Sequence, residues 1–427
     1  MAEQIITGID IGTSKIVSII AGLSAEDRTA RIMGFATVDS RGVRKGQIVD
    51  IAQVSSVLEE SIEKAERMAG VKVNSAYTTV GGPHISSINS HGVVAVSQPE
   101  GDITASDIDR AIEAAKAISL SSTREVIEVI PREYIVDGQS GIKNPVGMSG
   151  VRLEVNTHII TASVTNLKNI ERCLTDLGIS VDGFVFSGLA SSLSVISDTE
   201  KELSVVLVDI GGGKTDICIF LDGALSYSSS IPIGARHITN DIAVGLRISL
   251  ESAEKIKLFL MDKKNVKRKL DKETLSKKDD IDINDLQLIE GLSTVSYKTV
   301  IEGIMRPRLE EIYEKVFAEI ERSELADQVP SGLVIVGGGA STVASVEVAK
   351  QIIGMNARIG TPQHVTGLID EIMYPQYSAV VGLLLYAKDF HEEKARLNIK
   401  DFNSILRSFS VKGSVKKVVN IFKSYIP

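Results

Sequence analysis

The sequence has no tryptophan, and aromatic residues make up only 4% of its 427 residues. A core with so few aromatic rings must be filled by Val, Ile, Leu and Ala. Long apolar runs are also missing, because a run such as Val380 to Ala387 is too short to cross a bilayer. Met1 to Ile11 lacks the basic-then-apolar pattern of a secretion signal. We therefore expect the bulk of the protein to lie in the cytosol.

Cysteine is scarce as well. Cys173 and Cys218 lie far apart and do not have the spacing of metal ligands, so neither a disulfide nor a zinc framework is expected. Both have apolar neighbours, which predicts buried, reduced thiols.

The chain has no excess of positive charge. Its 47 Lys and Arg residues against 55 Asp and Glu give a net charge of −8, whereas a general nucleic-acid binder needs a basic surface. No nucleic-acid partner is therefore expected. The length exceeds the size at which one hydrophobic core usually stops growing, so we expect two lobes, or one lobed domain with insertions.

A strand–turn–strand pattern occurs twice. Asp10 to Lys15 and Asp209 to Asp216 each place an aspartate at the end of an apolar strand, before a glycine-rich turn and a second apolar strand. Glycine lets backbone N–H groups approach a phosphate closely, and Ser, Thr and Lys add donors and positive charge. An aspartate beside a polyphosphate normally holds Mg²⁺ through water. Two such turns facing each other would hold one nucleotide from both sides.

A third glycine turn, Gly337 to Ser341, follows another apolar strand. Thr342 stands where the dinucleotide-binding fingerprint requires its last glycine, which weakens that interpretation. The second turn is not a P-loop, because the first glycine of that motif would fall on Val208 and a strand follows Lys214 where a helix is required. Three glycine turns with two strand-end aspartates favour a nucleotide site over ordinary hairpins.

This arrangement resembles the superfamily of actin, sugar kinases and chaperone ATPases. The resemblance implies an α/β, actin-like fold, in which a ribonuclease H-like unit is duplicated into two lobes with ATP between them. The helices Gly188 to Ile196 and Ala379 to Ala387 look like the helices that connect the lobes. Asp10 and Asp209 are implied to hold Mg²⁺ through water. The residues implied to bind the nucleotide are Gly12, Thr13, Ser14 and Lys15 in the first phosphate motif; Gly211, Gly212, Gly213, Lys214 and Thr215 in the second; Gly337, Gly338, Gly339, Ala340 and Ser341 in the adenosine motif; and Glu254 and Lys257 at the nucleoside.

Within this superfamily the chain is similar to the FtsA family of bacterial cell division proteins. The similarity runs from Ile5 to Ile426, nearly the whole chain. The segments that carry it are Gly141 to Arg152, Phe186 to Ser192, Val208 to Asp216, Arg358 to Pro362 and Ser378 to Leu384.

The family resemblance implies four subdomains, a linker and a terminal helix. The core of the first lobe, subdomain 1A, comprises residues 1–83, 164–198 and 376–390, with the inserted subdomain 1C at 84–163. The core of the second lobe, 2A, comprises 199–245 and 301–375, with subdomain 2B at 246–300. A linker at 391–410 precedes a membrane-targeting amphipathic helix at 411–427.

The same resemblance implies an ATP-binding protein that polymerises into protofilaments and tethers FtsZ filaments to the cytoplasmic face of the cell membrane at the division site. It would thereby help to assemble the septum and its division machinery. The implied partners are the C-terminal peptide of FtsZ, a tubulin-like division protein, together with later division proteins. The FtsZ contact is expected in subdomain 2B.

One departure from the superfamily concerns hydrolysis. Chaperone and filament ATPases carry an acidic residue just before the first connecting helix, where this chain reads Phe186-Ser187-Gly188-Leu189. Losing a general base typically costs about 10²–10⁴-fold in rate. We expect at most a slow ATPase, with no assigned catalytic residue and a mainly structural role for ATP.

The C-terminal segment predicts an amphipathic helix. No acidic residue follows Asp401, and on a helix the apolar side chains fall within an arc of about 120°, with lysines opposite. Such a helix suits an anionic membrane surface, where each Lys adds roughly 1 kcal/mol. The alternative is a terminal helix docked on the protein's own core. The residues expected to bind the membrane are Val415, Lys416, Val418, Val419, Phe422, Lys423, Tyr425 and Ile426.

Two other functions fit the same fold. A small-molecule kinase would need a carboxylate base in the cleft, and the sequence offers no convincing one. Another membrane-associated actin homologue, such as a pilus-assembly or shape-determining protein, is the second alternative. Substrate-stimulated ATP turnover would favour the kinase, and binding to the FtsZ tail would favour the cell-division protein.

Overall fold

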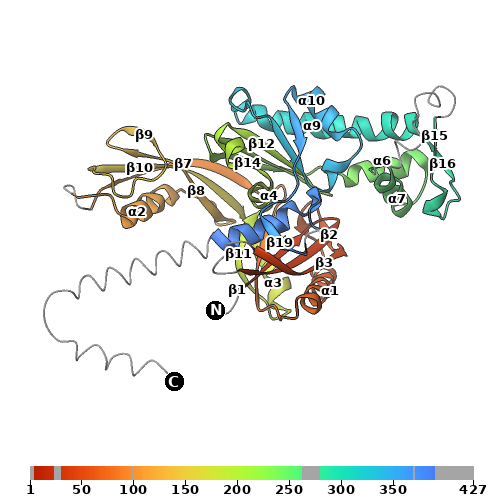
Figure 1. The fold of residues 1–427 in the computed structure, drawn as a ribbon, viewed down its shortest axis with the longest axis horizontal. Helices are drawn as coiled ribbons and strands as arrows, with labels where there is room; N and C mark the ends of the chain where they lie inside the picture. The colour runs from red at the N-terminus through yellow and green to blue at the C-terminus, as the bar shows by residue number, and fades with distance from the viewer. Residues whose placement is uncertain (1–3, 24–29, 98–100, 262–278, 369–370, 390–427) are drawn as a thin grey trace, which may run out of the picture. The chain divides into compact units, whose positions relative to one another are not determined.

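The computed structural model describes residues 4–23, 30–97, 101–261, 279–368 and 371–389 (Figure 1). The chain divides into two compact units, Met1–Leu385 and Tyr386–Pro427. The elements named below lie in the first unit, except for the end of the helix at 378–389. None of the helices in the described ranges combines the length and the apolar character needed to cross a bilayer.

A six-stranded sheet forms the first lobe. Helices α1 (Ile51–Ala69) and α3 (Val164–Thr175) pack against this sheet, and α1 buries one apolar face that includes Val54, Leu58 and Ile62. The small hairpin of β4 (Val43–Arg44) and β5 (Gln47–Ile48) precedes α1. The order of the six strands is β11 (Ser180–Phe186), β6 (Ser75–Val80), β1 (Gln4–Ile11), β2 (Lys15–Leu23), β3 (Ala30–Asp39) and β19 (Val365–Gly367).

A five-stranded sheet forms the second lobe. Helices α9 (Arg306–Arg322) and α10 (Ser345–Ile353) pack on each other and against this sheet. The short helix α5 (Asp198–Glu202) leads into its first strand. The order of the five strands is β14 (Ala224–Ile231), β13 (Thr215–Leu221), β12 (Val205–Ile210), β17 (Leu333–Val336) and β18 (Ala357–Ile359).

The two sheets repeat one plan. In each, an antiparallel hairpin (β1–β2 or β12–β13) has a further antiparallel strand on one side and a parallel strand, β6 or β17, on the other. The carboxyl ends of the parallel strands therefore meet at one edge, where open α/β sheets bind ligands. The duplication expected from the repeated turns is confirmed.

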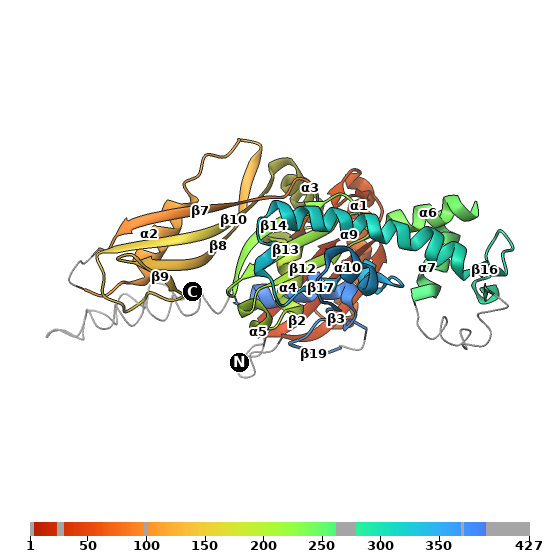
Figure 2. The same cartoon turned by 90° about the horizontal axis from the view of Figure 1, so that it is seen from above.

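The segment between β6 and α3 folds as a separate small layer. A four-stranded sheet in the order β7 (Ser86–Ala95), β10 (Arg152–Ser163), β8 (Arg124–Val136) and β9 (Gln139–Ile142) is covered by α2 (Ala105–Lys116). The buried side chains between sheet and helix include Ala111, Leu153 and Val155. We call this segment, residues 82–163, the inserted layer (Figure 2).

A second insertion precedes α9. It contains α6 (Arg236–Leu246), α7 (Leu250–Met261), the pair β15 (Asp280–Asp282) and β16 (Thr294–Ser296), and a π-helix, η2 (Lys298–Met305), that runs directly into α9. Its buried residues belong to the same core as those of the five-stranded sheet.

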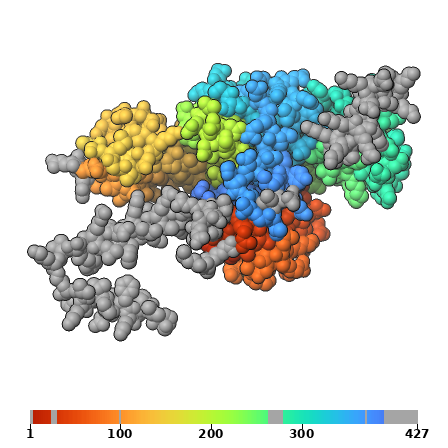
Figure 3. Space-filling view, viewed as in Figure 1, coloured from red at the N-terminus to blue at the C-terminus, as the bar shows by residue number. Residues whose placement is uncertain are grey.

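Two helices connect the lobes. α4 (Ser187–Val195) contacts strands of both large sheets, and the helix at 378–389 crosses it closely. A Cβ on Gly382 would lie only 1.7 Å from the carbonyl oxygen of Ala190, so glycine is required for this approach. The chain returns to the first lobe before this helix, since β19 pairs with β3 and the blue and red surfaces adjoin (Figure 3).

Candidate nucleotide-binding site

The first glycine turn joins β1 to β2. Asp10 is paired with Val17 in the ladder, and the Gly12 N–H donates to the Lys15 carbonyl oxygen at 3.0 Å. Thr79, at the end of the neighbouring β6, donates to Asp10 Oδ1 at 2.6 Å. Asp10 is therefore fixed at the carboxyl end of its strand, beside the turn.

The second glycine turn has the same construction. Asp209 is paired across the β12–β13 hairpin with Asp216, and the Gly211 N–H donates to the Lys214 carbonyl oxygen at 3.0 Å. Ser191 of α4 donates to Asp209 Oδ2 at 2.6 Å. The two turns are thus equivalent in position and in backbone hydrogen bonding.

The turns meet face to face. A Cβ on Gly212 would lie 2.0 Å from Ser14 Oγ, and one on Gly213 would lie 2.8 Å from Thr13 Cγ2. Thr13 also accepts a hydrogen bond from the Gly46 N–H at 3.0 Å. The structure therefore brings together the two turns that the sequence separates by about two hundred residues.

The electrostatics around Asp209 favour a cation. Burial raises the pKa of Asp209 to about 6, and the nearby Asp216 carboxylate adds to the rise, while Lys214 opposes it. A buried carboxylate of this kind gains from a positive neighbour. No group of three or more His, Cys, Asp or Glu suited to a metal occurs in the described ranges. Two aspartates beside phosphate oxygens suit Mg²⁺, which keeps most of its water.

The ammonium group of Lys15 is buried. Among the described residues, none accepts a hydrogen bond from its Nζ, which lies 3.9 Å from the centre of the Tyr377 ring. Burial lowers the pKa of Lys15 to about 8, against the attraction of Asp10 and Asp209. An ammonium group held so between two strand-end carboxylates would be satisfied by a phosphate oxygen. This orphaned donor is the observation that fits a nucleotide here.

The turn at Gly337 to Ser341 lies beside Asp209 of the second phosphate motif. The 3₁₀ turn η4 (Gly338–Ser341) follows β17, whose Val336 is in register with Asp209. Gly337 has a φ of +82°, and its N–H donates to the Pro375 carbonyl oxygen at 3.0 Å. A Cβ there would lie 2.3 Å from Asp209 Oδ1, so the turn adjoins the second phosphate motif.

Glu254 and Lys257 lie on α7 and contact each other. Lys257 Nζ donates to Glu254 Oε2 at 2.7 Å and to Thr239 Oγ1 of α6 at 2.9 Å. Burial lowers the pKa of Lys257, and the Glu254 carboxylate limits the change. The predicted i, i+3 proximity is therefore present, and a nucleoside would have to compete with this internal pair.

The sequence did not single out four residues that border the site, namely Ser187, Asp216, Ser230 and Tyr377. Ser187 donates to Asp216 Oδ2 at 2.6 Å, so a carboxylate does lie at the start of α4, although it comes from β13. Lys214 and Ser230 also donate to Asp216. Burial alone would lower the pKa of Lys214, but the carboxylates of Asp216 and Asp209 outweigh it and raise that pKa. The sequence pattern could have identified Asp216, because the hairpin places it opposite Asp209. No local sequence pattern identifies Tyr377.

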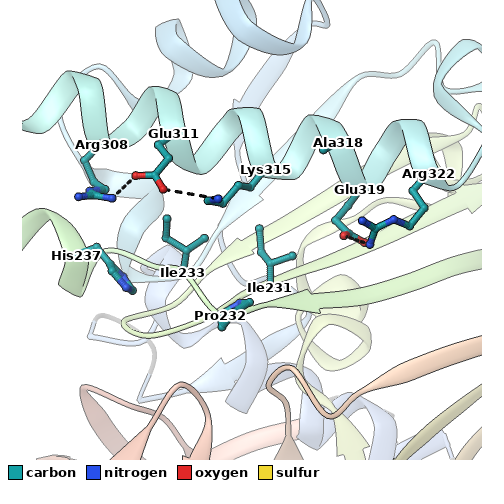
Figure 4. Close-up of a pocket in the computed structure, with 10 residues that line it drawn as sticks. All are labelled: Ile231, Pro232, Ile233, His237, Arg308, Glu311, Lys315, Ala318, Glu319 and Arg322. Carbon is teal, nitrogen blue, oxygen red and sulfur yellow. Dashed lines mark hydrogen bonds and ion pairs between the residues drawn. The ribbon is translucent and has the colours of Figure 1, made fainter.

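A groove lies behind the second turn, between α9 and the segment from β14 to α6 (Figure 4). Its volume is about 420 Å³, and Ile231, Pro232 and Ile233 form its apolar side. The charges on α9 pair with one another, Arg308 and Lys315 with Glu311 and Arg322 with Glu319. None of the residues predicted to bind the nucleotide lines this groove.

The predicted membrane-binding residues, from Val415 to Ile426, and the linker at 391–410 lie outside the described residues.

Comparison with known proteins gives family matches and relatives. A family model described as an SHS2 domain inserted in FtsA matches residues 82–161, and one described as cell division protein FtsA matches residues 206–382. The cell division protein FtsA of Pseudomonas aeruginosa is 37% identical over 387 residues, covering 90% of this chain and 89% of the relative. FtsA of Escherichia coli K12 is 34% identical over 406 residues, 91% of each chain.

Solved structures share the fold at low identity. A chain of a PilM–PilN type IV pilus biogenesis complex superposes with a TM-score of 0.62 at 14% identity, covering 89% of this chain and 98% of that one. MreB5 of Spiroplasma citri bound to ADP superposes with a TM-score of 0.52 at 13% identity, covering 92% and 98%. These similarities confirm the expected actin-like α/β fold.

Proposed function

The chain belongs to the FtsA family of cell division proteins, and on that premise we propose that it binds Mg·ATP between its lobes, polymerises, and tethers FtsZ filaments to the cytoplasmic membrane at the division site. The observation that supports the nucleotide site most strongly is the contact between the two glycine turns. Beside it lies the Lys15 ammonium, which has no hydrogen-bond acceptor in the described part of the chain.

Each part of the site has a proposed role. Residues Gly12 to Lys15 and Gly211 to Thr215 hold the phosphates, Gly337 to Ser341 hold the adenosine, and Glu254 and Lys257 hold the nucleoside. Asp10 and Asp209 hold Mg²⁺ through water. The bound nucleotide would supply a hydrogen-bond acceptor for the Lys15 ammonium, which has none among the described residues. It would also fix the two lobes in one relative orientation.

Hydrolysis would be slow. No carboxylate stands just before α4 in the chain, where related ATPases carry their base. Asp216, which accepts from Ser187 at the start of α4, also accepts from Lys214 and Ser230. An attacking water would have to compete with these three donors for its oxygens. ATP would therefore act mainly as a ligand for assembly.

The FtsZ peptide would bind the subdomain at 246–300. Large apolar side chains are exposed there at Leu250, Leu258 and Ile289, the last with 85% of its surface accessible. Exposed apolar side chains that gather into one patch often mark partner sites. Leu258→Asp and Ile289→Asp should each weaken binding of the FtsZ tail about tenfold, the loss of one apolar anchor. Val93→Asp, on the inserted layer, is the matched control.

Residues 411–427 would attach the protein to the membrane. The subdomains 1A, 1C, 2A and 2B would have the boundaries that the family resemblance implies. The experiment that tests the whole proposal is recruitment of a labelled FtsZ tail peptide to anionic vesicles by the full chain with Mg·ATP. Peptide that stays in solution while the protein is folded and binds ATP would contradict the tethering role. ATP turnover that rises with added small-molecule acceptors would favour a kinase instead.

A further inference from the structure

Lys214 reaches from the second lobe to the first. A Cβ on Gly46 would lie 2.8 Å from Lys214 Cδ, and one on Gly81 would lie 2.4 Å from Lys214 Nζ. The ammonium group is therefore seated against the end of β6, where the chain leaves the first lobe through Gly81 and Gly82 and enters the inserted layer.

Asp216 joins this ammonium to two hydroxyl groups. Lys214 donates to Asp216 Oδ2, and Ser230 Oγ donates to Oδ1 at 2.6 Å. The side chain of Asp216 is fully buried. A buried carboxylate is costly unless it is paired or hydrogen-bonded. If the Lys214 ammonium also binds another anion, its interaction with Asp216 weakens, and the hydroxyl donors must then stabilise Asp216 more.

Ser230 also contacts the inserted layer. Its Oγ accepts a hydrogen bond from the Gly82 N–H at 3.1 Å while it donates to Asp216, and a hydroxyl group can do both at once. One side chain on β14 thus connects the second phosphate turn to the first residue of the inserted layer.

The rest of this interface is polar. β7 and β14 lie side by side (Figures 1 and 2), and Ser87 Oγ donates to the Ser228 carbonyl oxygen at 2.7 Å. Buried His158 shares a hydrogen bond of 2.9 Å with Ser228 Oγ. Polar interfaces between domains permit relative motion more readily than apolar ones. Within the described part of the chain, Ser228 makes no hydrogen bond to Asp216, although it precedes Ser230 by only two residues.

We propose that Ser230 is a positioning residue through which phosphate binding at the second glycine turn is transmitted to the inserted layer. This inference rests on the proposed function, because the phosphate is that of the bound nucleotide. When the nucleotide binds, the Lys214 ammonium donates to a phosphate oxygen as well as to Asp216, and its bond to Asp216 weakens. Asp216 then depends more on the Ser230 hydroxyl, which is held in place with its lone pairs toward the Gly82 N–H. ATP binding therefore tightens the junction at Gly82.

Amide hydrogen exchange on the full chain, with and without Mg·ATP, tests this inference. In the wild type, ATP should slow exchange in peptides that cover residues 82–95 by about threefold to tenfold, a change of the size of one hydrogen bond's net contribution. Ser230→Ala, with ATP at saturating concentration, should show no such slowing, and because coupling between two sites is reciprocal it should bind ATP about threefold to tenfold more weakly. Ser230→Thr keeps the hydroxyl and should restore the slowing.

Ser228→Ala is the matched control, since it removes an interface hydroxyl without touching Asp216, and it should keep the ATP response. If Ser230→Ala does not fold, Ser230→Cys serves, because it fits the space with a much weaker hydrogen-bonding group. An ATP response that persists without the Ser230 hydroxyl, or is absent from an ATP-bound wild type, overturns the inference alone. A wild type that does not bind ATP overturns the proposed function with it.

Discussion

Ser14 occupies the space that a side chain on Gly212 would need. A Cβ on Gly212 would lie 2.0 Å from Ser14 Oγ and 3.1 Å from Ser14 Cβ, although the two residues belong to different lobes. Only glycine on one side allows the turns to approach so closely, and a turn with little side-chain bulk leaves its N–H groups accessible to phosphate.

Replacing Gly212 with alanine should push the two turns apart. The added methyl group meets Ser14 Cβ as well as Oγ, so a rotation of Ser14 alone does not relieve the contact. We expect ATP affinity to fall at least about tenfold, roughly the contribution of one hydrogen bond to a charged phosphate. Isothermal titration calorimetry measures it.

Gly303→Ala is the control, because Gly303 is not among the residues proposed to bind the nucleotide and the nearest atom to its added Cβ would lie at 3.4 Å, an ordinary contact. Equal affinities for the Gly212 and Gly303 variants would show that the contact between the turns does not matter for binding.

ATP affinity should depend on pH through Lys15. The pKa of Lys15 is lowered to about 8 in the free protein, and a bound phosphate favours the charged form. Below pH 8 the ammonium is already present. Above pH 8 binding must take up a proton, so the association constant should fall by up to about tenfold per pH unit. Lys15→Arg keeps the charge without titrating and should remove this dependence. A wild-type profile that is flat between pH 7 and pH 9.5 is the contrary result.

Asp209→Asn should weaken Mg·ATP binding about 10- to 100-fold, as is typical when a group that orients a metal is removed. With EDTA present, the substitution should have little effect, because the lost group acts on the metal. The pKa of Asp209 is raised to about 6, so the advantage that Mg²⁺ gives the wild type should shrink as the pH falls through 6. The asparagine variant should not show this change. Equal Mg²⁺ effects in both proteins would remove Asp209 from the metal site.

Deleting residues 411–427 should abolish sedimentation with anionic vesicles and leave ATP affinity unchanged. Replacing Lys416, Lys417 and Lys423 together by Gln should weaken vesicle binding about 100-fold, at roughly 1 kcal/mol for each charge. Undiminished vesicle binding by the truncated protein would remove the anchor assignment.

Gly382→Ala should destabilise the junction of the connecting helices. The new methyl group would lie 1.7 Å from the Ala190 carbonyl oxygen, so the backbone itself must move, at about 2 kcal/mol or more. The apparent melting temperature should fall. Gly303→Ala, also helical but with its nearest neighbour at 3.4 Å, should not lower it.

The parts of the site that were predictable are those with local signatures. Asp10 and Asp209 each stand at the end of an apolar strand before a glycine turn, and strand ends and glycine turns are visible in the sequence. Their duplication predicted two equivalent lobes, and the resemblance to a family predicted that the turns face each other.

The other parts depend on tertiary contacts. Tyr377 lies beside Lys15 although more than 350 residues separate them, and no pattern connects the two. In the sequence Asp216 is only the last residue of the second phosphate motif. The structure shows that Ser187 of α4 donates a hydrogen bond to its carboxylate. Thr299 to Glu321 has the periodicity of one continuous helix, whereas the structure has a π-helix up to Met305 and α9 from Arg306. The π-helix packs against α6, a contact that local periodicity does not encode.

A crystal structure with Mg²⁺ and a non-hydrolysable ATP analogue is the most direct measurement. The account predicts a triphosphate between the Gly12 and Gly212 turns, in contact with Lys15, and one hydrated metal ion shared by Asp10 and Asp209. An analogue bound elsewhere at saturating concentration, or no density between the turns, would contradict it.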